Sequence, residues 1–273
     1  GTTRVHDWDD ETVAYTCEPS MVTWAKGCGY SGRMSPFDGH GKLPWKVDWP
    51  AHWKVLGVTI EGAGKDHSSA GGSRDIAKAL CEEVFHIPNP YNLPYEFFLI
   101  GGKKMSSSKG LGLKARDLTK LLPPAVGRFL FTRTDYRRSI EFDPVGTMAI
   151  PDLFDEYDRC WHAYNEKEDE ELSHAFAYAQ TRETPARQPG FFIPRFRDIA
   201  NYSQLPNVDL WARFEKLKGS RLTDEERDIL GDRLTYTFVW LGNYAPDEYR
   251  YQISLKRYDE IDLSQGQWMF LND

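Results

Sequence analysis

Three lysines and three serines fall within the eleven residues from Ile100 to Gly110, and their side chains suit a ligand rich in phosphate. Lysine ammonium groups attract phosphate oxygens as point charges, and serine hydroxyls donate hydrogen bonds to them. Glycines in the same stretch let backbone N–H groups approach a ligand closely. The composition therefore predicts a loop that binds a polyphosphate, although a flexible basic surface loop has the same composition.

Two regular elements must position this loop. Residues 95–99 form a short aromatic and apolar run with the length of a β-strand. A polar helical pattern begins at Lys114, after the loop. We therefore expect the order strand, phosphate-binding loop, helix.

A second ligand-binding loop is expected over residues 61–73, which are rich in glycine. We expect it to connect a buried strand over residues 54–60 with a helix over residues 75–85, for which Ser73 is a candidate N-cap. A loop in this position is the usual ligand-binding corner of a doubly wound sheet. His67 is therefore expected to face a ligand, and a structural core histidine is the alternative.

Three tryptophans, Trp45, Trp49 and Trp53, fall within nine residues. Alternation predicts a strand that carries Trp45, Val47 and Trp49 on one face. In the functional interpretation, the aromatic rings and the carboxylate of Asp48 line a pocket for a cationic ligand. The alternative is a hairpin that packs the rings into the core.

Cys17 and Cys28 resemble one half of a zinc-binding turn, because glycines flank Cys28 and allow N–H groups to point at a thiolate. A tetrahedral zinc ion needs four ligands. His6 and His40 are only distant candidates for the remaining positions. Two cysteines without a metal are the alternative.

The totals describe a chain of 273 residues with 40% hydrophobic and 27% charged residues, as in ordinary soluble globular proteins. This length suits one large domain or two smaller ones. No apolar run approaches the length of a membrane helix, about 18 residues, and we expect no signal peptide at the polar start. Four scattered cysteines form no disulfide pattern, so we expect a reducing, cytoplasmic setting.

The net charge of −7 conceals a basic segment in the middle of the chain. Residues 101–138 hold ten Lys and Arg residues against two Asp and Glu residues. A local basic patch matters more than the total charge where a polyanion binds. The segment therefore keeps a nucleic-acid partner open, and a basic loop and helix on a mixed surface is the alternative.

The C-terminal half has a mainly helical pattern. Residues 125–132 and 152–165 carry apolar stripes at helical spacing. The acidic run over residues 166–171 predicts the solvated start of a further helix. Thr223 and Glu226 form a capping box, which predicts a helix N-terminus.

Residues 104–110 read Lys-Met-Ser-Ser-Ser-Lys-Gly and resemble the KMSKS signature of class I aminoacyl-tRNA synthetases, in the KMSSSKG form of class I lysyl-tRNA synthetases. In this family the loop closes over ATP and stabilises the pyrophosphate leaving group. The sequence departs from the general signature because Ser107 stands where its second lysine is found. Either Lys104 or Lys109 could then do most of the work.

The resemblance extends over nearly the whole chain. Four motifs in order are similar to the second half of the catalytic domain of an archaeal-type class I lysyl-tRNA synthetase: residues 42–49, 64–67, 95–98 and 104–110. Weaker likeness continues through residues 142–144, 153–158, 193–200 and 240–246. The half of that domain with the HIGH-type signature would precede residue 1, so we interpret the chain as an internal piece of a longer synthetase.

The resemblance implies a fold that is α/β plus all-α. It would contain the second half of a class I synthetase Rossmann-type catalytic domain, followed by a helical anticodon-binding domain. Residues 1–40 would form a partial zinc-knuckle-like insertion. Residues 41–150 would form the catalytic half with the KMSSSKG loop, and residues 151–273 an incomplete anticodon-binding domain.

The implied activity is that of a lysine-tRNA ligase, with lysine, ATP and tRNA-Lys as substrates, Mg²⁺ as cofactor and Zn²⁺ as a further candidate. The resemblance assigns catalysis to Lys104 and Lys109, lysine binding to Trp45, His67 and Tyr95, and metal binding to Cys17 and Cys28. It assigns ATP binding to Gly64, Asp66, His67, Lys104, Met105, Ser106, Ser107, Ser108 and Lys109.

This resemblance implies neither a membrane nor DNA as a partner, and we expect the isolated piece to be inactive. Two other classes remain open. One is an ATP pyrophosphatase-like nucleotide-binding enzyme that acts without tRNA. The other is a non-catalytic RNA-binding fragment.

Overall fold

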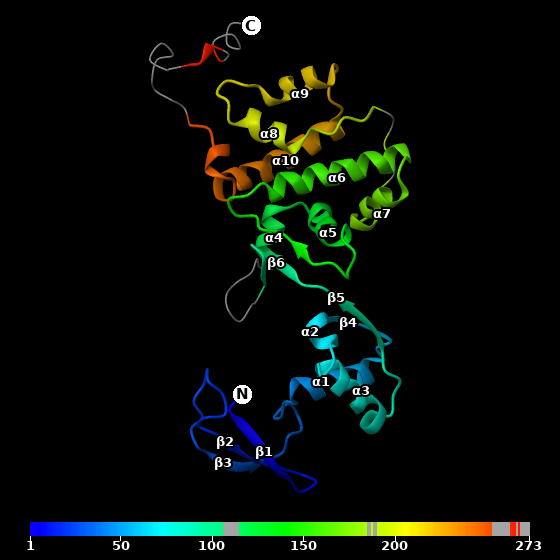
Figure 1. Cartoon of the computed structure of the whole chain (residues 1–273), viewed down its shortest axis with the longest axis vertical. Helices are drawn as coiled ribbons and strands as arrows, with labels where there is room; N and C mark the ends of the chain where they lie inside the picture. The colour runs from blue at the N-terminus through cyan, green and yellow to red at the C-terminus, as the bar shows by residue number, and fades with distance from the viewer. Residues whose placement is uncertain (106–114, 185–186, 188–189, 253–262, 266, 268–273) are drawn as a thin grey trace. The chain divides into compact units, whose positions relative to one another are not determined.

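The structure, a computed structural model, describes residues 1–105, 115–184, 187, 190–252, 263–265 and 267. The chain forms two compact units, Gly1–Tyr95 and Glu96–Asp273 (Figure 1). In the described parts of the chain, no helix combines the length and the apolar character that crossing a membrane requires.

The first unit begins with a three-stranded antiparallel sheet in the order β1-β2-β3. Its strands are β1 (Thr3–Trp8), β2 (Val13–Cys17) and β3 (Ser31–Met34). The guanidinium of Arg33 on β3 lies 2.7 Å from a carboxylate oxygen of Asp7 and 2.7 Å from one of Asp9. This sheet places Cys17 at the end of β2 and Cys28 just before β3.

The remainder of the first unit alternates helices and strands. Its elements are α1 (Trp45–Leu56), β4 (Ile60–Gly64), α2 (Lys65–Ser68), α3 (Ser73–Leu80), a π-helical turn (Cys81–Phe85) and β5 (Tyr91–Tyr95). The strands β4 and β5 pair in parallel, from Ile60 opposite Tyr91 to Gly64 opposite Tyr95. Parallel neighbours need a crossover connection, which α2 and α3 supply here.

The predicted tryptophan strand is wrong, because these residues open helix α1 instead. Trp45, Trp49 and Trp53 lie four residues apart, which places them on one face of an α-helix. Gly57 ends the helix with φ of 64°, a left-handed conformation that glycine adopts without strain. The strand predicted over residues 54–60 is wrong for the same reason, since β4 begins only at Ile60.

The helix predicted over residues 75–85 is confirmed, but its start differs. Helix α3 begins at Ser73, its N-cap is Gly72, and no side chain caps it. A Cβ atom on Gly72 would lie 2.5 Å from the carbonyl oxygen of His67 and 2.7 Å from that of Ser69. Ser73 is therefore the first residue of the helix and not its N-cap. The N-cap position lies too close to the backbone of His67 and Ser69 for any residue with a side chain.

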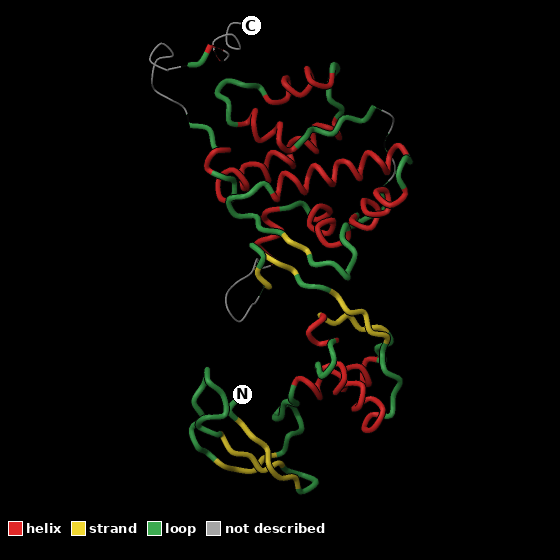
Figure 2. The backbone as a smooth tube through the Cα atoms, viewed as in Figure 1, coloured by secondary structure: helices red, strands yellow, loops and turns green. Residues whose placement is uncertain are grey.

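The second unit combines a small sheet with helices (Figure 2). The sheet has the order β7-β6-β8, with β6 (Phe98–Ile100), β7 (Lys103–Lys104) and β8 (Ile140–Glu141). The strand predicted over residues 95–99 is thus divided between the end of β5 and the start of β6. The helices are α4 (Ala115–Leu121), α5 (Pro124–Thr132), α6 (Ala149–Glu166), α7 (Glu170–Ala179), α8 (Phe196–Ser203), α9 (Leu210–Lys218), α10 (Asp224–Asn243) and a 3₁₀ turn (Asp247–Tyr249).

The helical predictions for this unit are confirmed. The two apolar stripes correspond to α5 and α6, and the acidic run leads into α7, whose N-cap is Asp169. The capping box forms at the start of α10: the Thr223 hydroxyl accepts from the Glu226 N–H, and the Glu226 carboxylate accepts from the Thr223 N–H at 2.8 Å.

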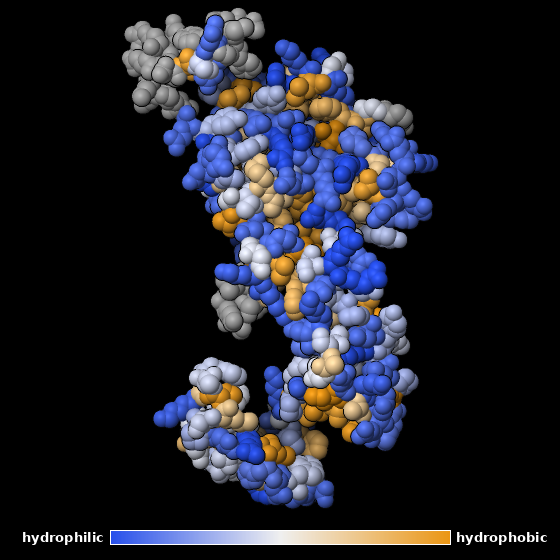
Figure 3. All heavy atoms as spheres, viewed as in Figure 1, coloured by the Kyte–Doolittle hydropathy of each residue, from blue (hydrophilic) through white to orange (hydrophobic). Residues whose placement is uncertain are grey.

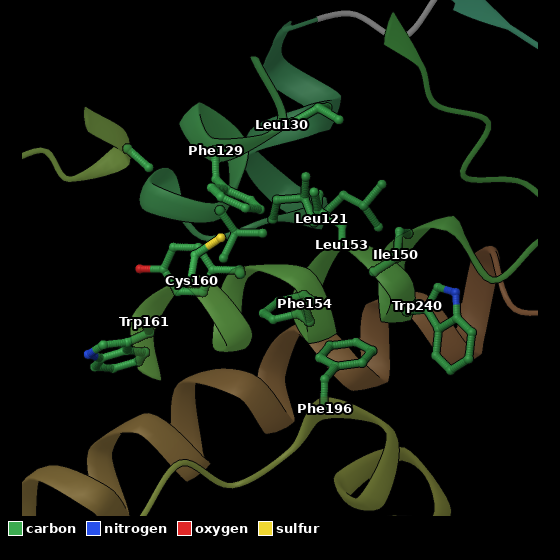
Figure 4. Packing of buried hydrophobic residues seen from close by; sticks show 14 of the residues in the cluster. Leu121, Phe129, Leu130, Ile150, Leu153, Phe154, Cys160, Trp161, Phe196 and Trp240 are labelled. Atoms are coloured by element: carbon green, nitrogen blue, oxygen red, sulfur yellow. The ribbon is translucent and has the colours of Figure 1, made fainter. Parts of the chain in front are cut away.

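The main core of the second unit lies between α5, α6, α8 and α10 (Figure 4). Phe154 on α6 stacks on Phe196 on α8 with ring centroids 4.2 Å apart. A buried ion pair also joins α6 to α10, since Arg233 Nη1 lies 2.7 Å from Asp158 Oδ2. Such a pair depends on both partners, because a single unpaired charge is costly in a protein interior.

Apolar side chains also lie at the surface (Figure 3). In the first unit, Val55, Leu56, Ile60 and Tyr91 are each at least 65% exposed. Ile60 and Tyr91 are partners in the β4–β5 pair. A parallel sheet is usually covered on both faces, so this exposure is unusual for such strands.

Candidate functional site

Helix α1 presents a row of three tryptophan rings, called the tryptophan stack below, in which Trp45 is stacked on Trp49 and the Trp53 ring is tilted by 58° to that of Trp49. The rings of Trp45 and Trp49 are nearly parallel, with centroids 5.1 Å apart, and those of Trp49 and Trp53 lie 4.8 Å apart. Trp53 and Trp49 are buried, whereas Trp45 is 52% exposed. The stack therefore ends in an outer ring that a ligand can contact.

His67 lies beside the outer rings of this stack. It belongs to α2, which follows β4 directly, and its ring centroid lies 6.2 Å from that of Trp45 and 6.0 Å from that of Trp49. Its Nδ1 is 3.4 Å from the hydroxyl oxygen of Ser73. The structure thus places His67 and Trp45 together.

Gly64 and Tyr95 face each other where β4 and β5 end. A Cβ atom built on Gly64 would lie 2.9 Å from Asp66 Oδ1, 3.9 Å from the Tyr95 ring and 4.0 Å from the His67 ring. Asp66, His67 and Tyr95 therefore lie around Gly64, and His67 lies beside Trp45 in turn. We call Trp45, Gly64, Asp66, His67 and Tyr95 the strand-end cluster.

Glu61 supports the cluster, although the sequence did not single it out. Its Oε1 accepts a hydrogen bond of 3.0 Å from the indole N–H of Trp49. This bond holds the ring on which Trp45 stacks. Glu61 lies on β4, opposite Asn92 on β5.

Arg74 is a second supporting residue that the sequence did not indicate. It is only 5% exposed, and its guanidinium carbon lies 4.5 Å from the centroid of the Trp53 ring. One of its nitrogens donates to the carbonyl of Pro90, whereas Nε and Nη1 have no hydrogen-bond partner among the described residues. Burial lowers the pKa of Arg74, and the nearby Glu61 carboxylate opposes that effect.

The predicted phosphate-binding loop begins as a tight hairpin in the second unit. Gly101 and Gly102 connect β6 to β7 with φ of 57° and 71°, the positive values that a two-residue type I′ turn requires. Lys103 and Lys104 are therefore strand residues, which corrects the prediction of a continuous loop from Gly101. Ser106, Ser107, Ser108 and Lys109 lie outside the described residues.

Lys104 is exposed at the end of this hairpin. Its Nζ lies 4.0 Å from the centroid of the Phe97 ring. At the turn, the Gly102 N–H donates to the Glu141 carboxylate, with both oxygens 3.2 Å away. The hairpin thus presents a lysine ammonium from a backbone that β8 supports.

The backbone of Cys28 lies next to the side chain of Cys17. The Cys28 N–H donates to Cys17 Sγ at 3.3 Å, and the Thr2 hydroxyl oxygen lies 3.2 Å from the same sulfur. The Thr2 and Cys28 hydrogen bonds hold the pKa of Cys17 below its usual value. Gly27 is required here, because a Cβ atom on it would lie 2.2 Å from the carbonyl oxygen of Glu18.

Two cysteines would supply at most two of the four ligands that a tetrahedral zinc ion needs. Among the residues that the structure describes, no group of three or more His, Cys, Asp or Glu side chains could hold a metal ion. His6 Nε2 instead lies 3.3 Å from the Thr16 hydroxyl oxygen.

Comparisons with known proteins find one family and several relatives. The family model of tRNA synthetases class I (K) matches residues 1–182. The chain is 32% identical, over 99% of its length, to a lysine–tRNA ligase of Methanosphaera stadtmanae, of which it covers 52%. It is 34% identical to the lysine–tRNA ligases of Archaeoglobus fulgidus and Methanosarcina barkeri, over 93% and 99% of its length, and covers 47% and 49% of them. The chain therefore spans about half the length of these curated relatives.

Proposed function

The chain belongs to the tRNA synthetases of class I (K), and from that premise we propose that the whole protein is a lysine–tRNA ligase. It activates lysine with ATP and then transfers the lysyl group to tRNA-Lys. The observation that carries this proposal is the strand-end cluster, because it combines exposed aromatic rings with a carboxylate where two parallel strands end. Ligands of open α/β sheets bind outside the carboxyl ends of the strands.

The strand-end cluster suits a ligand with an ammonium group. Trp45 and Tyr95 are each about half exposed, so their ring faces can attract a cation. Asp66 supplies a carboxylate next to these rings. Trp45 stacks on Trp49, and Glu61 holds Trp49 by a hydrogen bond. The Trp45 ring therefore has less conformational entropy to lose when lysine binds.

Activation joins a carboxylate oxygen of lysine to the α-phosphorus of ATP and breaks the bond from that phosphorus to the bridging oxygen. The electron pair leaves with pyrophosphate, where negative charge accumulates. Lys104 and Lys109 stabilise that charge, as preorganised cations do without reorganising in the transition state. When bound, Mg²⁺ neutralises part of the phosphate charge.

ATP contacts are assigned to two parts of the chain. Gly64, Asp66 and His67 contribute from the strand-end cluster, and Lys104 and Met105 from the hairpin. The assignment also includes Ser106, Ser107, Ser108 and Lys109 beyond the described residues.

Zinc is proposed as a structural ion of residues 1–40. Cys17 and Cys28 supply two ligands, since their backbone N–H and glycine geometry already favours a thiolate. The other two ligands would come from the part of the relatives' length that this chain does not span. A four-coordinate site would be complete only in the whole protein.

The domain assignment follows the same proposal. Residues 41–150 form the second half of a Rossmann-type catalytic domain, supported by the parallel pair β4–β5 and its helical crossover. Residues 151–273 form part of a helical anticodon-binding domain, supported by helices α6 to α10. The basic residues of the segment 101–138 favour tRNA as the partner, and charging of tRNA places the protein in the cytoplasm.

The test is ATP–pyrophosphate exchange by the whole protein with each of the twenty amino acids in turn, followed by charging of unfractionated tRNA. We expect exchange with lysine and charging of tRNA-Lys. Exchange without charging would instead favour an ATP pyrophosphatase-like enzyme, and RNA binding without exchange would favour a non-catalytic RNA-binding protein.

The chain 1–273 by itself should show no exchange. Positioning of reactants accounts for roughly 7–11 kcal/mol of a bimolecular barrier, and this chain carries only part of the groups that position ATP. Adding the remaining half of the protein in trans should restore activity. Appreciable lysine-dependent exchange by residues 1–273 alone would show that they contain a complete active site.

A further inference from the structure

The ammonium of Lys104 lies against the face of an aromatic ring. Its Nζ is 4.0 Å from the centroid of Phe97, well within the distance at which a ring attracts a cation. Lys104 pairs directly with Leu99 across β6 and β7, which makes Phe97 its diagonal neighbour on the same face. The contact therefore follows from the register of the hairpin.

The backbone on both sides of this contact is held in place. The Ile140 N–H donates to the carbonyl of Phe97 at 3.0 Å, and the Glu96 N–H donates to the carbonyl of Tyr136 at 2.8 Å. The turn that leads to Lys104 is held by the bond from the Gly102 N–H to Glu141. Ring and lysine thus start from fixed positions.

An aromatic face is a suitable support for a lysine that must bind phosphate. A lysine side chain in solution loses rotamer entropy when it is ordered, so ordering it beforehand favours binding. A carboxylate partner would order the ammonium but would also neutralise its charge. A ring contact orders an ammonium group without placing a negative charge beside it.

We propose that Phe97 is a positioning residue for Lys104, whose ring holds the lysine ammonium ready for the polyphosphate of ATP. The inference rests on the proposed function, in which Lys104 stabilises the leaving pyrophosphate. Phe97 lies outside the KMSSSKG motif and would act on pyrophosphate release only through Lys104.

The contact itself can be measured on the 273-residue chain without any assay of activity. Protons above a ring face are shifted upfield, so the Cε protons of Lys104 should be upfield in a ¹H–¹³C spectrum, and Lys104→Ala identifies their signal. Phe97→Leu should abolish the shift and Phe97→Tyr should keep it. Lys103 is the internal control, because its side chain points to the opposite face of β7. Equal shifts for the two lysines would overturn the inference.

The role of the contact is measured in the whole protein. Phe97→Leu should lower kcat for lysine-dependent ATP–pyrophosphate exchange about 2–5-fold, the range that loss of an exposed cation–ring contact predicts. KM for lysine should stay unchanged, and Phe97→Tyr should restore kcat. Phe97→Met replaces the leucine variant if that protein does not fold.

A double-mutant comparison decides whether Phe97 acts through Lys104. In the Lys104→Ala background, Phe97→Leu should add less than about 2-fold, because the cation that the ring holds is already absent. A loss of the same size in both backgrounds would overturn the inference and leave Phe97 a structural residue only. If the unaltered protein shows no exchange, the proposed function fails, while the proton shifts still report on the contact.

Discussion

Replacement of Trp45 by alanine tests the proposed lysine pocket most directly. The change removes the outer ring of the tryptophan stack, which is 52% exposed, and leaves the buried Trp49 with its hydrogen bond to Glu61. The core of the first unit should therefore remain intact. The effect should fall on the ligand that contacts the exposed ring face.

The expected magnitude follows from the contact that is lost. A cation over a tryptophan face contributes about 0.5–2 kcal/mol. Since about 1.4 kcal/mol corresponds to a factor of ten, KM for lysine should rise about 2–30-fold. KM for ATP should change less than about 2-fold, because Trp45 is not among the residues to which ATP contacts are assigned.

The assay is lysine-dependent ATP–pyrophosphate exchange by the whole protein, with lysine and ATP varied separately. Trp24→Ala is the matched control, because Trp24 is 81% exposed and lies in the loop between β2 and β3. It should leave both KM values unchanged. An equal rise of the two KM values in Trp45→Ala, or a lower thermal unfolding temperature that accounts for the loss, would refute the pocket.

Three further predictions concern other parts of the chain. Lys104→Ala should lower lysyl-adenylate formation by roughly 10²-fold, as expected for one preorganised donor, with lysine binding unchanged by calorimetry; near wild-type exchange would contradict the role of the hairpin. Arg233→Ala should cost about 3–5 kcal/mol in urea unfolding, because it leaves the buried Asp158 unpaired. Arg227→Ala breaks an exposed pair and should cost less than about 1 kcal/mol, so similar losses would count against this reasoning. Thr2→Val removes the hydroxyl that lowers the pKa of Cys17, so the Cys17 thiolate should form at higher pH. The pH profile of Cys17 alkylation by iodoacetamide should therefore move to higher pH. An unchanged profile would mean that Thr2 does not affect the Cys17 pKa.

Cys160 provides an internal control for the alkylation experiment. Burial raises its pKa to about 11, and the residue is 1% exposed. It should therefore stay unmodified in the folded chain over the pH range in which Cys17 reacts. Modification of both cysteines at similar rates would indicate that the chain had unfolded.

Local patterns were sufficient for much of the helical second unit. The capping box at Thr223 and Glu226 formed as predicted, because its bonds join residues three apart. The apolar stripe of α6 likewise predicted a buried face, which packs against α8 and α10. The spacing of residues three or four positions apart is enough to predict such a cap and such a buried helix face.

The sequence by itself indicated the candidate residues Trp45, His67 and the KMSSSKG motif, because they stand in a recognisable order. Only the tertiary structure decided how they are presented. Three tryptophans spaced four apart also fitted an alternating strand in part, and the packing of Trp49 and Trp53 against Arg74 selects the helix. The contact of Glu61 with Trp49 depends on how α1 packs against β4. The contact of Phe97 with Lys104 depends on how β7 pairs with β6. The spacing of residues in the sequence specifies neither arrangement.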